Sequence, residues 1–243
     1  TFPLGINYYL FSIFSIIESF KFKPSIYITR NFFTCFLLVI LKKNSIIELH
    51  HDLNMESRIV KFLVTKFKFL NSSYVKKVVA ITNGVKNEYV ENNVVNKNKV
   101  TILPSGSSIK KKFEYSYNKK FFNIGYFGSL FQSRGLSLIN SLAKIDKNNN
   151  YHLFGDLKKI ENNFKYKNLN KKILINDYVP YRDVPKELKK MDILLMPYVS
   201  SITVAGNVGD ITKFTSPLKL FDYLSAGKII ICSDFKVLKE VIK

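Results

Sequence analysis

The sequence contains no tryptophan and only two cysteines, and four of its 38 basic residues are arginine. Cys35 and Cys232 both lie within apolar runs, a position typical of buried thiols. The sequence therefore predicts neither a disulfide framework nor a zinc site. A long hydrophobic run is also missing, because the stretches Ile6 to Ile17 and Phe32 to Leu41 are shorter than the roughly 20 residues that cross a bilayer. A transmembrane helix is not predicted.

A secretory signal is not predicted either, since no basic segment precedes an apolar one among the first residues. The chain starts at Thr1 and stops at Lys243, inside a segment with a helical pattern. We therefore expect the sequence to be truncated at both ends.

The net charge of +20 is the strongest feature of the composition. Clustered basic residues would favour nucleic-acid binding, but the lysines here are spread among Asn, Ile and Phe rather than gathered in a stripe. Nucleic acid is therefore not an expected partner. A basic surface would still attract anionic lipid headgroups, so peripheral contact with a membrane is retained as a hypothesis.

Short apolar runs alternate with helical stretches along the whole chain. Runs that are apolar throughout favour parallel strands buried on both faces, and their alternation with helices indicates doubly wound α/β sheets. The length of 243 residues suits two such domains. The predicted strands are Ser25 to Thr29, Ser45 to Leu49, Val78 to Ile81, Val100 to Leu103, Phe122 to Tyr126, Tyr151 to Phe154, Ile173 to Ile175, Ile193 to Met196 and Ile229 to Cys232.

The stretch between Pro104 and Lys120 is polar and basic and carries Gly106, which indicates a connection between domains. We predict a first domain over residues 1–110, a linker at 111–120 and a second domain over 121–243. In the second domain, Asp183 is predicted to cap one helix, and Ser216 to cap another that Gly227 closes.

Two segments of the second domain carry residue types suited to phosphate and sugar chemistry. Gly128 follows a predicted strand and precedes a helix, so backbone N–H groups of this turn would face an anion, and Arg134 would add further donors. Lys219 and Asp222 are three residues apart near the start of another helix and share one of its faces. That helix follows the long loop from Tyr198 to Thr215, and loops of this length are often functional.

The stretch from Ser216 to Ile231 resembles the signature of family 4 glycosyltransferases, in which a Pro-x-Lys-Leu-x-Glu-Tyr segment precedes Ala-Gly-Lys and an apolar strand. Three other stretches resemble the family in the same order, namely Val78 to Thr82, Val100 to Gly106 and Val179 to Tyr198. The resemblance implies the GT-B fold, with two Rossmann-like domains of which the N-terminal one is incomplete here. It also implies that the C-terminal domain binds a nucleotide-diphosphate sugar.

The resemblance assigns donor-binding roles to individual positions of this chain. Asp222 stands where the family has the second Glu of a Glu-x7-Glu motif, which contacts the nucleotide ribose. The first Glu falls at Phe214, so Asp210 is considered as a catalytic substitute. The Arg and Lys that clamp the diphosphate fall at Ser129 and Arg134, and Lys219 is the candidate to replace the missing charge. The other implied donor contacts are Gly128, Val179, Ser216 and Leu218.

His50 follows a predicted strand of the first domain and resembles the family's strand-end His that approaches the donor sugar, with His51 as the neighbouring candidate. His152, at the start of a strand, is interpreted as structural. The implied reaction transfers a sugar to a saccharide or lipid-linked acceptor with retention, without a metal or other cofactor. The implied setting is polysaccharide, lipopolysaccharide or glycolipid synthesis in the cytoplasm, at the inner face of the cytoplasmic membrane.

Alternatives remain open at this point. A nucleotide-sugar epimerase on the same fold would give no net transfer. A catalytically silent relative, favoured by Ser129 and Phe214, would bind nucleotide sugars without turnover. Because we expect both ends to be truncated, we also expect residues 1–243 alone to be a poor catalyst.

Overall fold

The computed structural model describes residues 4–110, 112–114, 118–130, 134–156, 169–199 and 211–242. The chain forms two compact units. The first comprises Thr1–Pro104, Lys213–Ser216 and Lys236–Lys243, and the second comprises Ser105–Thr212 and Pro217–Phe235. The two short C-terminal segments thus belong to the first unit, although the sequence analysis assigns them to the second domain. The segment predicted as a linker falls within the second unit.

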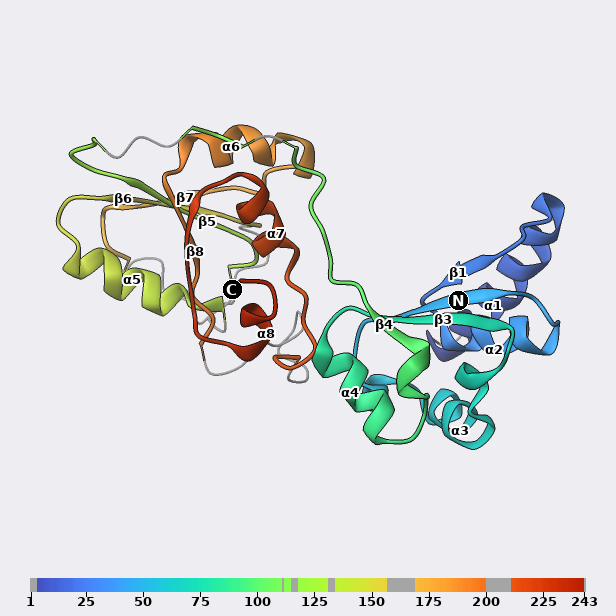
Figure 1. The fold of residues 1–243 in the computed structure, drawn as a ribbon. Coiled ribbons are helices and arrows are strands. Elements are labelled where there is room, and N and C mark those ends of the chain that lie inside the picture. The colour runs from blue at the N-terminus through green and yellow to red at the C-terminus, as the bar shows by residue number, and fades with distance from the viewer. Residues whose placement is uncertain are drawn as a thin grey trace. The chain divides into compact units, whose positions relative to one another are not determined.

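The first unit contains a four-stranded parallel sheet with the strand order β1-β2-β3-β4. Its strands are Tyr27–Thr29, Ser45–Leu49, Val75–Ala80 and Val100–Ile102. Each connection runs from one strand to its neighbour in the same direction, so right-handed crossovers place the connecting helices on one face. Figure 1 shows these helices on the same side of the strands: α2 (Phe32–Ile40), α3 (Arg58–Phe67) and α4 (Asn83–Glu91).

The N-terminal ends of these three helices follow from local sequence. Asn31, Ser57 and Thr82 each accept a hydrogen bond from a backbone N–H in the first helical turn, as N-cap residues do. The helix α1 (Leu4–Ser19) precedes the sheet and contacts α2. Among the described helices, none is both long and apolar enough to cross a membrane.

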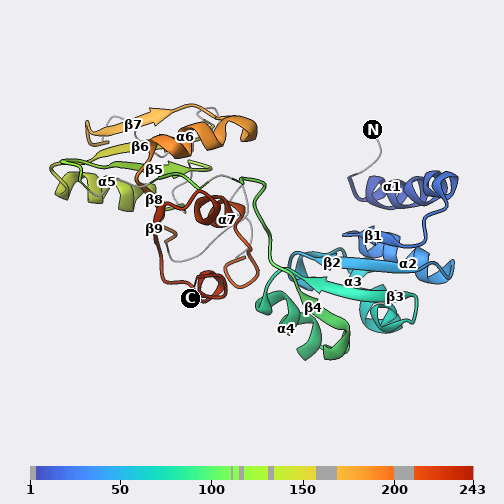
Figure 2. The same ribbon diagram turned by 45° about the horizontal axis from the view of Figure 1, so that its top comes forward.

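The second unit contains a five-stranded parallel sheet with the strand order β7-β6-β5-β8-β9. Its strands are Asn123–Phe127 (β5), Asn150–Phe154 (β6), Ile173–Asn176 (β7), Ile193–Met196 (β8) and Ile229–Cys232 (β9). Figure 2 shows the strands side by side in this order. The order reverses direction between β5 and β8, because the chain builds outward to β7 and then returns to the other side of β5. Ligands bind at such switch points in open α/β sheets.

The helices of the second unit are α5 (Leu136–Ile145), α6 (Val184–Lys190) and α7 (Leu218–Ser225). The connections through α5 and α6 run in opposite directions along the sheet, so right-handed crossovers place these helices on opposite faces. Figure 1 shows α5 and α6 on the two sides of the sheet. A short helix, α8 (Lys236–Lys239), follows β9 and belongs to the first unit.

All nine predicted strands are present and parallel, which confirms the α/β class with two parallel sheets. Each unit has its own buried core, one around Ile47, Leu49 and Val78 and the other around Ile124, Tyr126 and Leu153. One face of α5 buries Leu136, Ile139 and Ala143, whereas Leu142 is 39% exposed.

Of the three residues predicted to lie at helix ends, Asp183 and Gly227 do so and Ser216 does not. Asp183 is the N-cap residue of α6, but its carboxylate pairs with Lys186 at 2.8 Å instead of accepting a backbone N–H. Ser216 is not the cap of α7, because Pro217 is still extended (φ −72°, ψ 113°) and the helix begins at Leu218. The predicted closure at Gly227 is confirmed, since this residue has a φ of +67° and donates its N–H to the Leu224 carbonyl.

Candidate functional site

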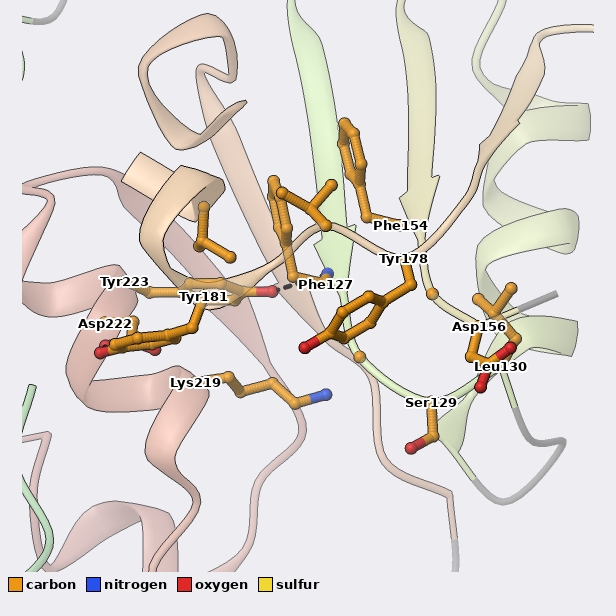
Figure 3. Close-up of a pocket in the computed structure, with 14 residues that line it drawn as sticks. Phe127, Ser129, Leu130, Phe154, Asp156, Tyr178, Tyr181, Lys219, Asp222 and Tyr223 are labelled. Atoms are coloured by element: carbon orange, nitrogen blue, oxygen red, sulfur yellow. Dashed lines mark hydrogen bonds between the residues drawn. The ribbon is translucent and has the colours of Figure 1, made fainter. Parts of the chain in front are cut away.

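A cavity of about 570 Å³ opens at the carboxyl ends of β5, β6 and β7 in the second unit. Strand-end residues, the turn after β5, the entry to α6 and the first turns of α7 form its wall (Figure 3). Open α/β sheets bind their ligands at this edge. The lining residues are Phe127, Gly128, Ser129, Leu130, Phe154, Gly155, Asp156, Tyr178, Val179, Tyr181, Val184, Lys219, Asp222 and Tyr223.

Glycines let the turns after β5 and β6 approach each other at the cavity. Gly128 has a φ of +146°, a backbone conformation that L side chains rarely adopt, and its N–H bonds the Phe154 carbonyl at 2.9 Å. A Cβ at Gly155 would collide with the Gly128 carbonyl oxygen. The rings of Phe127 and Phe154 stack with their centroids 4.4 Å apart beside this turn. The result is a close-packed apolar wall next to exposed backbone.

Lys219 extends from the first turn of α7 toward the turn after β5 (Figure 3). Its Nζ would lie 2.9 Å from a Cβ placed on Gly128, so the ammonium group occupies the space that glycine leaves. It lies 4.4 Å from the centroid of the Tyr126 ring and 5.4 Å from that of Tyr198. Burial, and in second place the charge of Arg134, lowers the pKa of Lys219 to about 7. The structure thus holds a cation in a weakly solvating position at the pocket wall.

Arg134 is not among the described residues that line the cavity. Its guanidinium carbon lies 5.5 Å from the centroid of the same Tyr198 ring that Lys219 approaches. The two cations therefore share one aromatic neighbour and repel each other. An anion bound near them would relieve this repulsion.

Asp222 lies one turn after Lys219 on α7 and is 8% exposed. Its Oδ1 accepts hydrogen bonds from the Ser107 hydroxyl at 2.5 Å and from the Tyr181 hydroxyl at 2.9 Å. The neighbouring Tyr223 hydroxyl accepts the Phe127 N–H at 3.0 Å, which ties α7 to the end of β5 (Figure 3). A buried carboxylate with hydroxyl partners thus stands at the opposite end of the cavity wall from the glycine turn.

Some of the other predicted donor-binding residues line the cavity and others do not. Ser129 and Val179 line the cavity with Gly128, Lys219 and Asp222. Leu218 is 63% exposed, and among the described residues that line the cavity neither it nor Ser216 occurs. Asp210 lies outside the described residues.

Sequence reasoning missed the aromatic part of the pocket. Tyr178 and Tyr181 follow β7, and Phe127 and Phe154 end β5 and β6. Their positions directly after or at the end of predicted parallel strands were the available signal, because the carboxyl ends of such strands share one edge.

In the first unit, His50 follows β2 and its Nε2 lies 3.3 Å from the Glu48 carboxylate. The same carboxylate receives the Arg30 Nε at 2.8 Å, and this hydrogen bond is the main cause of the lowered pKa of Glu48. His51 instead pairs with Glu56 at 2.7 Å. His152 lies on β6 with its ring stacked near that of Phe154, and burial lowers its pKa. Within the part of the chain that the structure describes, no group of three or more His, Cys, Asp or Glu could hold a metal ion.

Phe214 stands where the resemblance expects a carboxylate, and its ring packs against the core of the first unit. The Thr82 hydroxyl donates to its carbonyl at 3.5 Å. A Cβ at Gly84 would collide with the carbonyl of the adjacent Lys213, so this segment lies directly on the N-terminal end of α4. Phe214 therefore has a packing role in place of a ligand-binding one.

No protein-family model and no curated protein matches the sequence. Solved structures do match. The lipopolysaccharide outer core galactosyltransferase WaaB, in its apo form, is 18% identical with a TM-score of 0.62 over 98% of this chain and 63% of its own. A glycosyltransferase from Rickettsia africae is 16% identical with a TM-score of 0.67 over 100% of this chain and 66% of its own.

An α,α-trehalose-phosphate synthase (UDP-forming) from Burkholderia vietnamiensis is 12% identical, with a TM-score of 0.60 over 96% of this chain and 62% of its own. The chain thus spans less than two thirds of the length of the structures it matches. At identities this low, the matches bear on the fold and not on the activity. They agree with the two units of parallel sheets, and the chain has the fold of the GT-B glycosyltransferases.

Proposed function

We propose that this chain is the larger part of a glycosyltransferase that moves a hexosyl group from a nucleotide-diphosphate sugar to a saccharide or lipid-linked acceptor. The observation that carries the proposal is the cavity at the carboxyl ends of β5 to β7, which Gly128, Lys219 and Asp222 line together. This arrangement offers backbone donors, a cation and a carboxylate, which are the groups that a diphosphate and a pentose require.

The cationic part of the site suits the diphosphate. The turn at Gly128 and the Lys219 ammonium line the cavity and are proposed to face the phosphates, and Arg134, near the same Tyr198 ring as Lys219, adds a second positive charge. Negative charge grows on the diphosphate as the glycosidic bond to it breaks. Cations fixed at that position stabilise the transition state more than the ground state, so they contribute directly to the rate.

The carboxylate part of the site suits the ribose. Asp222 is proposed to accept a hydrogen bond from a ribose hydroxyl, while Val179 and the aromatic residues near it contact the base. Ser129 is proposed to contact the phosphates, and Ser216 and Leu218 to border the donor from the start of α7. These roles rest on the resemblance for Ser216 and Leu218 and on the cavity for the others.

The reaction is proposed to retain the configuration of the anomeric carbon, through an oxocarbenium-like transition state. On the resemblance alone, His50 and Asp210 are proposed to act at the sugar. The proposed setting is the cytoplasm, in polysaccharide, lipopolysaccharide or glycolipid synthesis, with peripheral contact to an anionic membrane that the net charge of +20 supports.

The test is nucleotide release by the complete gene product from a panel of UDP-, GDP- and dTDP-sugars, with and without candidate acceptors. We expect release from one nucleotide class, and Lys219→Ala and Arg134→Ala should each weaken binding of that nucleotide sugar by roughly ten- to a hundredfold. A matched surface control is Lys186→Ala, whose ammonium pairs with Asp183 on α6. Unchanged diphosphate affinity in both pocket variants would remove these residues from the site.

A second candidate function is a catalytically silent protein that binds nucleotide sugars. It is favoured by Ser129 and by Phe214, which packs against a core where the family has a carboxylate. The same panel separates the two functions, because a silent protein binds a nucleotide sugar without releasing nucleotide.

A further inference from the structure

Two hydroxyl groups donate to the Asp222 carboxylate, and a third hydroxyl bonds one of these two donors. The Ser107 Oγ accepts the Ile109 N–H at 3.0 Å, so its own proton is available for Asp222 Oδ1, 2.5 Å away. The Ser108 hydroxyl donates to the Tyr181 hydroxyl at 3.2 Å, and Tyr181 donates to the same Oδ1 at 2.9 Å. Two donors thus converge on one carboxylate oxygen.

The second oxygen of Asp222 is in a different situation. It receives no hydrogen bond from any residue that the structure describes, although Asp222 is 8% exposed and lines the cavity. A carboxylate oxygen that borders the cavity without a donor from the described residues can accept a hydrogen bond from a ligand hydroxyl, and bonds to a charged group are the stronger ones. The second oxygen of Asp222 is therefore available to accept a hydrogen bond from a ligand.

Contacts of the neighbouring backbone hold Asp222 and its two hydroxyl donors in place. Ile109 is buried next to Ser107, and the Phe113 N–H bonds the Ala226 carbonyl at the end of α7. Tyr181 is held by the short helical turn that precedes α6. Asp222 itself lies in the middle of α7, next to Tyr223, whose hydroxyl is fixed to β5. The carboxylate has little freedom to rotate, so its second oxygen keeps one direction.

We infer that Tyr181 and Ser107 are positioning residues that hold one oxygen of Asp222 so that the other accepts a hydrogen bond from the pentose of the bound nucleotide. This inference rests on the proposed function and deepens it, because it makes the site selective for ribose over deoxyribose. It also explains how an aspartate serves at a position where the family has the longer glutamate. The short side chain is oriented by neighbouring hydroxyls.

The test is calorimetric binding of UDP, GDP and their 2′-deoxy and 3′-deoxy forms to the complete gene product. The unsubstituted protein should prefer a ribonucleotide over at least one deoxy form by roughly ten- to a hundredfold, the effect of a hydrogen bond to a charged group. Tyr181→Phe and Ser107→Ala should each reduce this ratio to about threefold or less.

Tyr151→Phe is the matched control, because it also removes a hydroxyl that donates to a carboxylate, Asp146 Oδ2 at 2.7 Å, and neither residue is among the described residues that line the cavity. It should leave the ratio between ribose and deoxyribose forms within about twofold of the unsubstituted protein. Far-ultraviolet circular dichroism and thermal unfolding verify that each variant is folded.

The outcomes separate the inference from the proposed function. A ratio that stays high in both Tyr181→Phe and Ser107→Ala, with nucleotide still bound, overturns the inference and leaves the glycosyltransferase proposal intact. The absence of discrimination in the unsubstituted protein has the same meaning. If neither UDP nor GDP binds at all, the proposed function and the inference both fail.

Discussion

Lys219 is a cation surrounded by two tyrosine rings, with a second cation nearby. Burial favours its neutral form, and a bound diphosphate would favour its charged form. Because the pKa of Lys219 is about 7 in the free protein, its side chain changes between the charged and the neutral form close to physiological pH. The protonation state of one side chain therefore links nucleotide binding to pH.

We predict that the affinity for a nucleoside diphosphate falls as the pH rises from about 6.5 to about 8.5. At a pH below the Lys219 pKa of about 7, the free protein already carries the positive charge on Lys219. At a higher pH, binding must be accompanied by uptake of a proton, which lowers the affinity by up to about tenfold per pH unit. Calorimetry in buffers with different ionisation enthalpies measures this proton uptake. Lys219→Arg, which stays charged, should bind with little pH dependence. Equal pH profiles for both proteins would contradict the prediction.

Gly128 combines a φ of +146° with the close approach of the Lys219 ammonium. Gly128→Ala should lower the free energy of unfolding by about 1 to 3 kcal/mol, the usual cost of a strained backbone, and should also weaken nucleotide binding because the new methyl displaces Lys219. Urea unfolding and calorimetry measure the two effects.

Gly106→Ala is the matched control, since a Cβ there meets nothing within 4 Å. It should change stability by less than about 0.5 kcal/mol. A Gly128→Ala protein as stable as this control would show that the turn relaxes without strain.

At the scale of elements, the segment Lys213–Ser216 has two structural roles. It leads into α7, which carries Lys219 and Asp222, and it packs with the first unit through Phe214. Since the partly buried Phe214 packs against the core of the first unit, a carboxylate at this position would lie against apolar groups at a cost in stability.

Phe214→Glu tests this interpretation directly, because it restores the residue type of the resembled family. We predict a loss of about 1 to 3 kcal/mol in the free energy of unfolding and no gain in nucleotide affinity, since the new side chain would enter an apolar cluster. Phe22→Ala, at a phenylalanine that is 81% exposed in the same unit, should be nearly neutral. Tighter nucleotide binding by the glutamate variant would instead assign Phe214 to the donor site.

At the scale of the whole molecule, the net charge of +20 sets the long-range electrostatic interactions of the protein. We predict that the protein floats with vesicles rich in anionic lipid at about 0.15 M salt and is released at about 0.5 M salt, because screening shortens the range of surface electrostatics. Vesicles of neutral lipid should not retain it. Binding to neutral vesicles of equal strength would exclude an electrostatic contact.

Much of the fold could be predicted from the sequence. All nine short apolar runs form strands, since the strands of parallel sheets that helices cover are rich in apolar residues, and this signal is local. Gly227 was likewise predictable as a helix end, since its backbone conformation favours glycine. The candidate cap Ser216 was not, because Pro217 keeps the chain extended for one residue more.

The sequence by itself thus determined the class of fold, the position of each strand and the presence of Lys219 and Asp222 at the start of one helix. Only the tertiary structure decided which groups meet. It brings Tyr181 and Ser107 onto Asp222 and sets Lys219 against Gly128 and two tyrosine rings. It also packs Phe214 against the core of the first unit. These contacts join residues far apart along the chain, and they depend on strand order and helix packing, which no local pattern of residues encodes.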